Sequence, residues 1–267
     1  MYTLGFIGTG NMGGAMARAA SKKLCGEQIL LANRTAEKAR ALAKDLGCAA
    51  ADNATVCRES QYIVLGVKPQ MMPGLLNELA PILRSREDRF VLVTMAAGLT
   101  VARIRELAGG EYPVIRIMPN TPCAVGSGVV LCCRSENVSD AEYKAFQDAF
   151  SEAGLILDIG ESLMDAGSAI SGCGPAFVYM FIESLSDAGV ACGLPYADAQ
   201  RLAAATVEGA AKMVQQSTEH PAQLRNLVCS PAGSTIEGVL CLENRGFRAA
   251  VSESVRASFE RTKELGK

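Results

Sequence analysis

Two short segments of the sequence have residue types and spacings suited to binding anions. Near the amino terminus the chain reads Gly8-Thr9-Gly10-Asn11-Met12-Gly13, directly after an apolar run. Near the carboxyl terminus it reads Ser230-Pro231-Ala232-Gly233-Ser234-Thr235, where a turn of small residues leads into a helical pattern. The first turn of a helix offers unpaired backbone N–H groups, which favour phosphate and carboxylate groups. We therefore expect a dinucleotide at the first segment and a carboxylate substrate at the second, although the second also fits an ordinary Ser-Pro helix cap.

The glycine motif has the sequence context of a dinucleotide site. It follows an expected strand and opens the helical stretch 12–22. Gly8 permits the tight turn, Gly10 lets the backbone approach a pyrophosphate, and Gly13 lets helix and strand pack closely. A glycine-rich corner without a ligand is the alternative. The residues expected to hold the cofactor here are Gly8, Thr9, Gly10, Asn11, Met12 and Gly13.

The end of the second expected strand indicates which dinucleotide binds. In an NAD site this position, about twenty residues after the glycine motif, usually has Asp or Glu, which binds the ribose 2′-hydroxyl. This chain has Asn33-Arg34-Thr35 instead. Arg34 can pair with a 2′-phosphate, and Asn33 and Thr35 can donate hydrogen bonds to it. The sequence favours NADPH over NADH, unless Arg34 is a solvated surface charge and Thr35 only caps the next helix.

Three further segments follow expected strands, where ligands of parallel sheets bind. They are Val67-Lys68-Pro69, Met95-Ala96-Ala97-Gly98 and Pro119-Asn120-Thr121-Pro122. The small residues Ala96, Ala97 and Gly98 let a nicotinamide ring lie against the backbone. Lys68 and Asn120 can bond cofactor or substrate oxygens. Each segment alone also fits a turn that ends a strand.

Composition and charge exclude several functional classes. The 267 residues carry a net charge of −2, and their basic residues form no stripe, which argues against nucleic-acid binding. No apolar run reaches the roughly 18 residues of a membrane span, and the amino terminus has no targeting pattern, so we expect a soluble, cytoplasmic protein. Ten cysteines without a C-x-x-C pair and a single histidine predict buried, reduced thiols and no metal site.

The order of the apolar runs predicts an α/β fold. Amphipathic stretches such as 35–46 and 139–153 alternate with short β-branched runs, which indicates a doubly wound, mainly parallel Rossmann sheet. We therefore expect a cofactor-binding domain over residues 1–160. The expected strands are Thr3–Ile7, Gln28–Ala32, Tyr62–Val67, Phe90–Thr94, Val114–Met118, Val129–Cys133 and Leu155–Ile159.

The remaining residues, 161–267, are expected to form an all-helical domain for substrate binding and dimerisation. Its helices are rich in Ala, Gly and Ser, as in Ala203-Ala204-Ala205 and Gly209-Ala210-Ala211. Small residues on several helix faces leave little core for about 100 residues, and a homodimer would supply the missing burial. A compact monomeric bundle is the alternative. The expected helices are 175–190, 197–216, 221–229, 235–243 and 248–265.

Few residues can donate a proton to a ketone during hydride transfer. The usual donors are His, Lys and Tyr. The lone His220 precedes Pro221 in an expected loop, no lysine occurs between Lys144 and Lys212, and Tyr179 lies in an apolar run. A protonated C=N group is already electrophilic, so Ser and Thr hydroxyls are sufficient to orient a cyclic imine. The sequence therefore favours an imine over a ketone as substrate.

Seven motifs in order resemble those of the pyrroline-5-carboxylate reductases of proline biosynthesis, and the resemblance covers the whole chain. They are Phe6-Ile7-Gly8-Thr9-Gly10-Asn11-Met12-Gly13, Val67-Lys68-Pro69, Arg116-Ile117-Met118-Pro119-Asn120-Thr121-Pro122, Ser171-Gly172-Cys173-Gly174-Pro175-Ala176, Asp187-Ala188-Gly189-Val190, Gly193-Leu194-Pro195 and Ser230-Pro231-Ala232-Gly233-Ser234-Thr235-Ile236-Glu237.

The resemblance implies reduction of 1-pyrroline-5-carboxylate to L-proline by NAD(P)H in a dimer, or a decamer built from dimers, with active sites at the subunit interface. It implies that Ser230, Gly233 and Ser234 hold the substrate carboxylate and that the Thr235 hydroxyl faces the ring nitrogen. Glu161 matches an acidic position near the substrate in some relatives. Asn53 matches a position that contacts the ribose on the adenine side.

The chain departs from the family pattern at two positions. Ala232 stands where the family usually has the first of two glycines, and Cys229 stands where Ser or Thr is common. Ala adopts positive φ less readily than Gly, so we expect a slightly different carboxylate cradle. A related two-domain 3-hydroxyacid dehydrogenase and a non-catalytic NADP-binding sensor are the competing interpretations. The missing lysine counts against the first, and the intact turn before Thr235 counts against the second.

Overall fold

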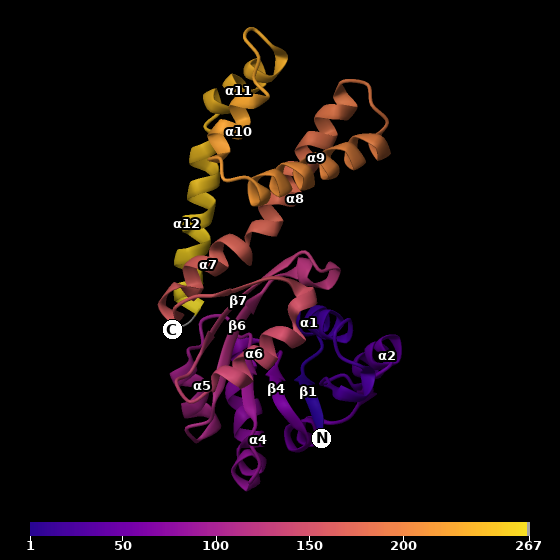
Figure 1. Ribbon diagram of the computed structural model, residues 1–267, viewed down its shortest axis with the longest axis vertical. Coiled ribbons are helices and arrows are strands. Elements are labelled where there is room, and N and C mark those ends of the chain that lie inside the picture. Colours follow the sequence, from indigo (N-terminus) through magenta and orange to yellow (C-terminus); the bar gives the residue numbers. More distant parts are fainter. Residues whose placement is uncertain (266–267) are drawn as a thin grey trace. The chain divides into compact units, whose positions relative to one another are not determined.

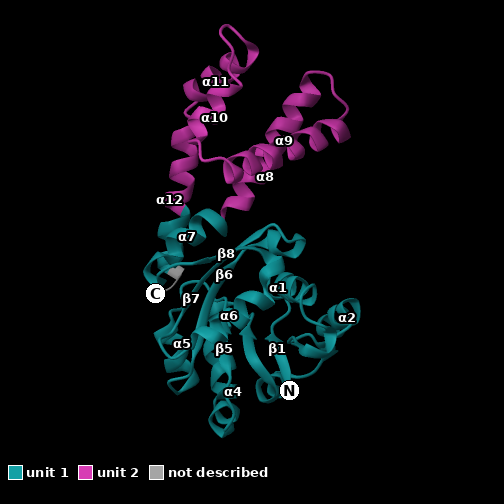
Figure 2. Ribbon diagram, viewed as in Figure 1, with its two compact units in different colours: residues 1–172, 258–267 teal, residues 173–257 magenta. Residues whose placement is uncertain are grey.

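The computed structural model describes residues 1–265 and contains two compact units (Figure 2). Unit 1 comprises Met1–Gly172 and the end of the last helix from Ser258, and unit 2 comprises Cys173–Ala257. The two units are defined by which parts of the backbone lie close together. The division into domains 1–160 and 161–267 was drawn by function and stays a prediction, and its residues 266–267 lie outside the described part of the chain.

Within the described residues, unit 1 is built on an eight-stranded sheet of order β3-β2-β1-β4-β5-β6-β7-β8 (Figure 1). All neighbouring strands are parallel except β6 and β7. The predicted Rossmann sheet and its seven strands are confirmed, and β3 is an additional short strand. The strands are β1 (Tyr2–Ile7), β2 (Ile29–Ala32), β3 (Ala49–Ala50), β4 (Ser60–Leu65), β5 (Val91–Thr94), β6 (Val114–Pro119), β7 (Gly128–Arg134) and β8 (Gly154–Asp158).

Helices cover both faces of the sheet because its central strands are apolar on both sides. Helices α1 (Asn11–Ser21), α2 (Ala36–Leu46) and α6 (Asp140–Ala149) bury one core with Leu4 and Phe6. Helices α3 (Asn53–Glu59), α4 (Met72–Ser85) and α5 (Val101–Ala108) bury a second core with Ile7. Short 3-10 helices complete the connections: η1 (Gly26–Gln28), η2 (Pro69–Met71), η3 (Thr121–Val125), η4 (Ser151–Ala153) and η5 (Glu161–Leu163).

The strand order determines where a ligand can bind. Strand β1 pairs with β2 on one side and β4 on the other, so the direction of winding reverses there. In open parallel sheets the crevice beyond the carboxyl ends of such strands receives the ligand. The glycine motif follows β1 at this point. A further helix of unit 1, α7 (Met164–Ser171), packs on β6 and β7.

Unit 2 consists of helices with little buried side-chain surface of their own. Only Ser186, Ala199 and Ala203 are buried among its described residues, whereas Tyr179 and Met180 are 58% and 66% exposed. Such apolar exposure is unusual for a free monomer. The predicted helices are confirmed, with these bounds: α8 (Gly174–Ala191), α9 (Tyr196–Gln216), α10 (Pro221–Leu227), α11 (Ser234–Asn244) and α12 (Phe247–Leu265).

The cysteines differ in part from the prediction of buried thiols. All ten are free, and Cys57, Cys123, Cys132 and Cys133 are buried. Burial raises the pKa of the Cys132 thiol to about 12, so it stays protonated at neutral pH. Three thiols are exposed within one chain, contrary to the prediction, because no other part of the same chain covers them. They are Cys25, Cys192 and Cys241.

Among residues 1–265, no helix has the length and apolar character needed to cross a membrane. The same residues contain no group of three or more His, Cys, Asp or Glu side chains arranged to hold a metal ion.

Helix α6 begins with reciprocal caps, and an ion pair joins its first turn to the segment before β5. Ser139 Oγ accepts a hydrogen bond from Glu142 N, and the Glu142 carboxylate accepts one from Ser139 N at 2.8 Å. Arg89 donates two further bonds to that carboxylate, from Nε at 2.6 Å and Nη2 at 3.0 Å. The Arg89 guanidinium, followed by the Ser139 donors, lowers the pKa of Glu142 to about 2.

In the Glu142→Gln variant the free energy of unfolding should therefore change less as the pH is lowered into the acid range. A lowered carboxyl pKa stabilises the fold fully above the unfolded-state pKa of about 4.3, and this stabilisation is lost as pH falls towards about 2. Glu142→Gln should lower the unfolding free energy by about 1–3 kcal/mol at pH 7 and by progressively less between pH 4.5 and 2. Urea denaturation at several pH values measures the difference. Glu208→Gln, which removes an exposed helix ion pair, is the control and should show little change.

Candidate active site

The glycine motif forms a tight strand-to-helix corner at the carboxyl end of β1. Gly8 has φ +101°, and a Cβ there would lie 2.6 Å from the Gly66 carbonyl oxygen. A Cβ on Gly13 would lie 2.0 Å from the Gly8 carbonyl oxygen. A Cβ on Gly10 would have no atom within 4 Å. The outer glycines thus permit backbone contacts inside the protein, and Gly10 leaves open space at the start of α1.

This corner has unused hydrogen-bonding groups that fit a phosphate. In the described part of the chain no side chain caps α1 at Gly10, so the N–H groups of its first turn are available. Over the same residues the Thr9 hydroxyl oxygen is buried and has no hydrogen-bond partner. Buried polar groups are normally paired, so an unpaired hydroxyl beside an open helix start fits a cofactor diphosphate. Asn11 and Met12 form the first residues of that helix.

Asn33 connects this corner to the end of β2. Its Oδ1 accepts a hydrogen bond from Thr9 N at 3.2 Å, and its Nδ2 donates one to the Thr35 carbonyl oxygen at 3.2 Å. A hollow of about 600 Å³ begins here and is lined by polar, charged and alanine residues of the segment after β2 and of α2, β3, α3 and α4. Its lining residues are Asn33, Arg34, Ala36, Arg40, Ala50, Ala51, Asp52, Asn53, Ala54 and Glu78.

The structure thus brings three predicted residues, Asn33, Arg34 and Asn53, to one hollow. Arg34 is exposed, and its Nη1 lies 3.9 Å from Met71 Sδ. Thr35 is the residue before α2 and does not line the hollow. An exposed guanidinium beside a hollow of this size fits a phosphate on the ribose of a dinucleotide.

The segments after β4 and β5 also flank the crevice. The first begins beside the glycine motif, because a Cβ on Gly8 would lie 3.2 Å from Val67 Cγ1. Lys68 is exposed, and Pro69 opens η2. Ala97 lies in the turn after β5 and packs against a small apolar cluster on β6, β7 and α7.

Asn120 has a structural role that the sequence did not reveal. Its side chain is almost fully buried, and its Oδ1 accepts a hydrogen bond from Val129 N at 2.9 Å. Its Nδ2 donates to the Ser171 carbonyl oxygen at 2.9 Å. The amide therefore joins β6, β7 and α7 instead of offering hydrogen bonds to ligand oxygens.

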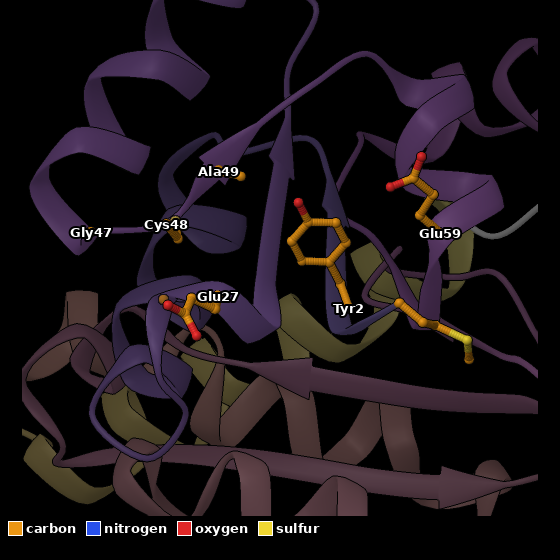
Figure 3. Close-up of a pocket in the computed structure, with 8 residues that line it drawn as sticks. Tyr2, Glu27, Gly47, Cys48, Ala49 and Glu59 are labelled. Carbon is orange, nitrogen blue, oxygen red and sulfur yellow. The ribbon is translucent and has the colours of Figure 1, made fainter.

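A separate hollow of about 580 Å³ lies at the amino ends of the strands (Figure 3). Tyr2, Cys48, Ala49, Glu27 and Glu59 line it, and it contains no predicted site residue. Ligands of open parallel sheets bind at the opposite, carboxyl ends. This hollow is therefore not the cofactor crevice.

The predicted carboxylate cradle is a compact turn in unit 2. Gly233 N donates a hydrogen bond to the Ser230 carbonyl oxygen at 3.1 Å, and α11 begins with Ser234 and Thr235. In the described residues no side chain caps this helix at Gly233. A Cβ on Gly233 would lie 2.3 Å from Ser230 Oγ, so only glycine fits there without a shift. Ser230, Ser234 and Thr235 are exposed, and the turn therefore presents hydroxyls together with unpaired N–H groups.

Ala232 adopts the backbone conformation that glycine prefers. Its φ is +56°, and it is the one non-glycine residue with positive φ among residues 1–265. This conformation costs an L-residue about 1–2 kcal/mol. The turn around Ser230 and Gly233 thus keeps a residue in the left-handed conformation, although alanine replaces the glycine of the family pattern. The resulting backbone strain lies within the carboxylate cradle.

Glu161 lies in unit 1 at the start of η5, and its carboxylate bonds to other parts of that unit. Oε1 accepts a hydrogen bond from Val101 N at 2.7 Å and lies 3.2 Å from Arg116 Nη1. Arg116 also pairs with Asp165 at 3.2 Å. No role for Arg116 or Asp165 was predicted from the sequence. The one available signal was a charged residue inside the otherwise apolar strand β6.

Comparisons with known proteins agree with this arrangement. The family model described as pyrroline-5-carboxylate reductase dimerisation matches residues 161–265, and one described as NADP oxidoreductase, coenzyme F420-dependent, matches residues 3–98. Pyrroline-5-carboxylate reductases of Synechocystis and Glycine max are 38% and 39% identical to this chain, over 99% of it and 98% and 96% of their own lengths. A Plasmodium falciparum pyrroline carboxylate reductase, solved with NADP bound, is 34% identical with a TM-score of 0.89, over 100% of this chain and 98% of that one.

Removing the Arg34 guanidinium tests the discrimination between cofactors. We expect Arg34→Ala to raise the dissociation constant of NADPH about 10–100-fold, the size of a lost charge-assisted hydrogen bond, and that of NADH less than about twofold. Titration by nucleotide fluorescence measures both constants. Lys44→Ala removes an exposed cation from α2, outside the hollow, and should change neither constant. If Arg34→Ala weakened the binding of NADPH and NADH equally, Arg34 would not bind the 2′-phosphate.

Proposed function

Because this chain belongs to the pyrroline-5-carboxylate reductase family, we propose that it reduces the cyclic imine 1-pyrroline-5-carboxylate to L-proline, with NADPH preferred to NADH. The observation that carries the proposal is the match to reductases of that name over nearly the full length of the chain. The uncapped helix starts at α1 and α11 support the proposal, because the reaction needs one site for a cofactor diphosphate and one for a substrate carboxylate.

The residues of the cradle have separate proposed roles. The backbone N–H groups at the start of α11, with Ser230, Gly233 and Ser234, bind the substrate carboxylate. The Thr235 hydroxyl oxygen accepts a hydrogen bond from the protonated ring nitrogen. This bond stabilises the protonated form, in which the C=N group is electrophilic. A reduced nicotinamide supplies the hydride when bound. No imidazole or ammonium is required, because the product nitrogen is basic and keeps the proton.

For the cofactor we propose binding by the corner after β1, the hollow beside Arg34 and the turns after β4 and β5. Thr9, Asn11 and the glycines hold the diphosphate, as the unpaired Thr9 hydroxyl supports. Arg34 binds a 2′-phosphate. The nicotinamide lies at the turn after β5, where Ala97 leaves room for the ring. The other proposed contacts follow from position alone and involve Met12, Asn33, Thr35, Asn53, Val67, Lys68 and Pro69.

We further propose that the chain forms a homodimer through residues 161–267. Two observations support a partner subunit: the match of a dimerisation model to 161–265 and the large apolar exposure of unit 2. Tyr179, Met180, Leu202 and Met213 are each more than half exposed within one chain, which counts against a self-sufficient monomeric bundle. Assembly into decamers and a cytoplasmic location stay predictions.

A substrate panel tests this function against its rivals. Purified protein should oxidise NADPH rapidly with 1-pyrroline-5-carboxylate and form proline, while small 2-oxo and 3-oxo acids should give little turnover. Oxidation with a 3-oxo acid instead would indicate a hydroxyacid dehydrogenase. Tight NADPH binding without turnover of any substrate would indicate a sensor.

Thr235→Ala should slow turnover far more than it weakens NADPH binding. The lost hydroxyl is assigned to the substrate nitrogen, so kcat should fall about 10²-fold or more, the range of general acid–base groups, with the NADPH dissociation constant within about twofold. Steady-state kinetics and nucleotide titration measure the two quantities. Thr235→Ser keeps the hydroxyl and should retain most activity. Unchanged turnover in Thr235→Ala would contradict a catalytic role for Thr235.

A further inference from the structure

The turn between β5 and α5, residues Met95–Thr100, is held at both ends. At its beginning, Ala96 N donates a hydrogen bond to Thr94 Oγ1 at 3.3 Å. At its end, Thr100 Oγ1 accepts one from Arg103 N at 3.2 Å, which caps α5. Gly98 has φ +75°, so the chain reverses within a few residues. The proposed function assigns this turn, through Ala97, to the nicotinamide.

A second cap on α5 comes from far along the sequence. Glu161 Oε1 accepts a hydrogen bond from Val101 N at 2.7 Å, the first N–H of the helix. A carboxylate at a helix N-terminus is stabilised by the helix dipole as well as by this bond. Glu161 thus holds the point where the turn becomes helix, and its own position determines where that point lies.

Arg116 holds Glu161 in place from inside the sheet. Its side chain is 3% exposed, and it pairs with Glu161 and with Asp165, each at 3.2 Å. Its Nε is buried and has no partner among the residues that the structure describes. A buried guanidinium is stable only with its anionic partners in place, so the three side chains have little freedom to separate.

Packing connects the same elements. Ala97 contacts the cluster formed by Met118, Leu131, Cys133 and Met164, the last of which belongs to α7. Helix α7 approaches β7 closely because its Gly167 has no side chain: a Cβ there would lie 2.6 Å from Leu131 Cδ1. The turn is therefore fixed on one side by the Glu161 carboxylate and on the other by the packing of α7.

We propose that Glu161 is a positioning residue for the nicotinamide, acting through Val101 N on the Met95–Thr100 turn, and that Arg116 and Asp165 fix its carboxylate. This proposal rests on the proposed function, which places the nicotinamide at that turn. It differs from the substrate contact that the family resemblance implies for Glu161. The two roles predict different losses when the carboxylate is removed.

Comparing two nucleotides separates these roles. The fragment 2′,5′-ADP occupies the adenine side and lacks nicotinamide, whereas NADPH needs the turn. Glu161→Ala should raise the dissociation constant of NADPH about tenfold and lower kcat about 10–100-fold, because small displacements at a reacting group are costly. The affinity for 2′,5′-ADP should stay within about twofold of wild type. Calorimetric titration of both nucleotides measures the difference without any imine.

Three variants serve as controls. Glu161→Gln keeps an oxygen that accepts from Val101 N and should recover most of the NADPH affinity. Glu106→Ala removes a surface carboxylate, paired with Arg103, from the same helix and should have no effect. Asp165→Asn keeps Glu161 but weakens the ion pairs that fix its carboxylate. It should therefore raise the dissociation constant of NADPH more than that of 2′,5′-ADP, by less than Glu161→Ala does. It carries the test if Glu161→Ala does not fold.

Two outcomes would overturn the proposal. Equal weakening of NADPH and 2′,5′-ADP would mean that Glu161 supports the fold in general. Unchanged NADPH affinity with a raised KM for the imine would mean direct substrate contact. Failure of the proposed function is a separate result, because the wild-type protein would then leave 1-pyrroline-5-carboxylate unreduced while both nucleotides could still be titrated.

Discussion

The contact between bare backbones at the carboxyl ends of β1 and β4 is the constraint on which the rest of unit 1 depends. A Cβ on Gly66 would lie 2.4 Å from the Gly8 carbonyl oxygen, and one on Gly13 would lie 2.0 Å from the same atom. Three glycines therefore allow β1, β4 and α1 to meet without side chains between them. As a result α1 starts directly at the reversal of strand order, where its open first turn and the Thr9 hydroxyl can serve a phosphate.

The two proposed anion sites are built by the same physical means in different settings. Each is a turn of small residues that ends in a helix without a side-chain cap, so backbone N–H groups remain for a ligand. At α1 the turn uses glycine for positive φ, whereas at α11 it uses Ala232, which makes that turn more costly. The shortage of imidazole and ammonium groups suits an imine, whose nitrogen carries its own proton, and that chemistry agrees with the family to which the chain belongs.

The sequence predicted the elements that depend on local pattern. Seven strands were predicted because buried parallel strands read as continuous apolar runs, and β3 was missed because Ala49 and Ala50 alone give no such run. The helices of unit 2 were predicted from stretches rich in Ala, Gly and Ser that lack the β-branched runs of strands. The exposure of Cys192 and Cys241 was missed because it depends on how few residues cover those helices.

The local geometry of the candidate site was predictable where one segment contains the whole signal. The corner at residues 8–13 and the cradle at residues 230–235 are of this kind. The roles of Arg116 and Asn120 were not predictable, because their partners Glu161 and Ser171 lie 45 and 51 residues away. Arg116 was visible only as a charged residue inside an apolar strand, and Asn120 only as a polar residue just after that strand. Only the folded structure shows that their side chains bond to η5 and α7.

Transfer of a label is the most direct test of the central claim, that this chain reduces an imine carbon with hydride from NADPH. NADPH carrying deuterium on the transferable face of nicotinamide C4 would be mixed with 1-pyrroline-5-carboxylate and the wild-type protein, and the product analysed by mass spectrometry and NMR. We predict proline with one deuterium at C5. Proline without deuterium, or no proline despite saturation with NADPH, would contradict the account.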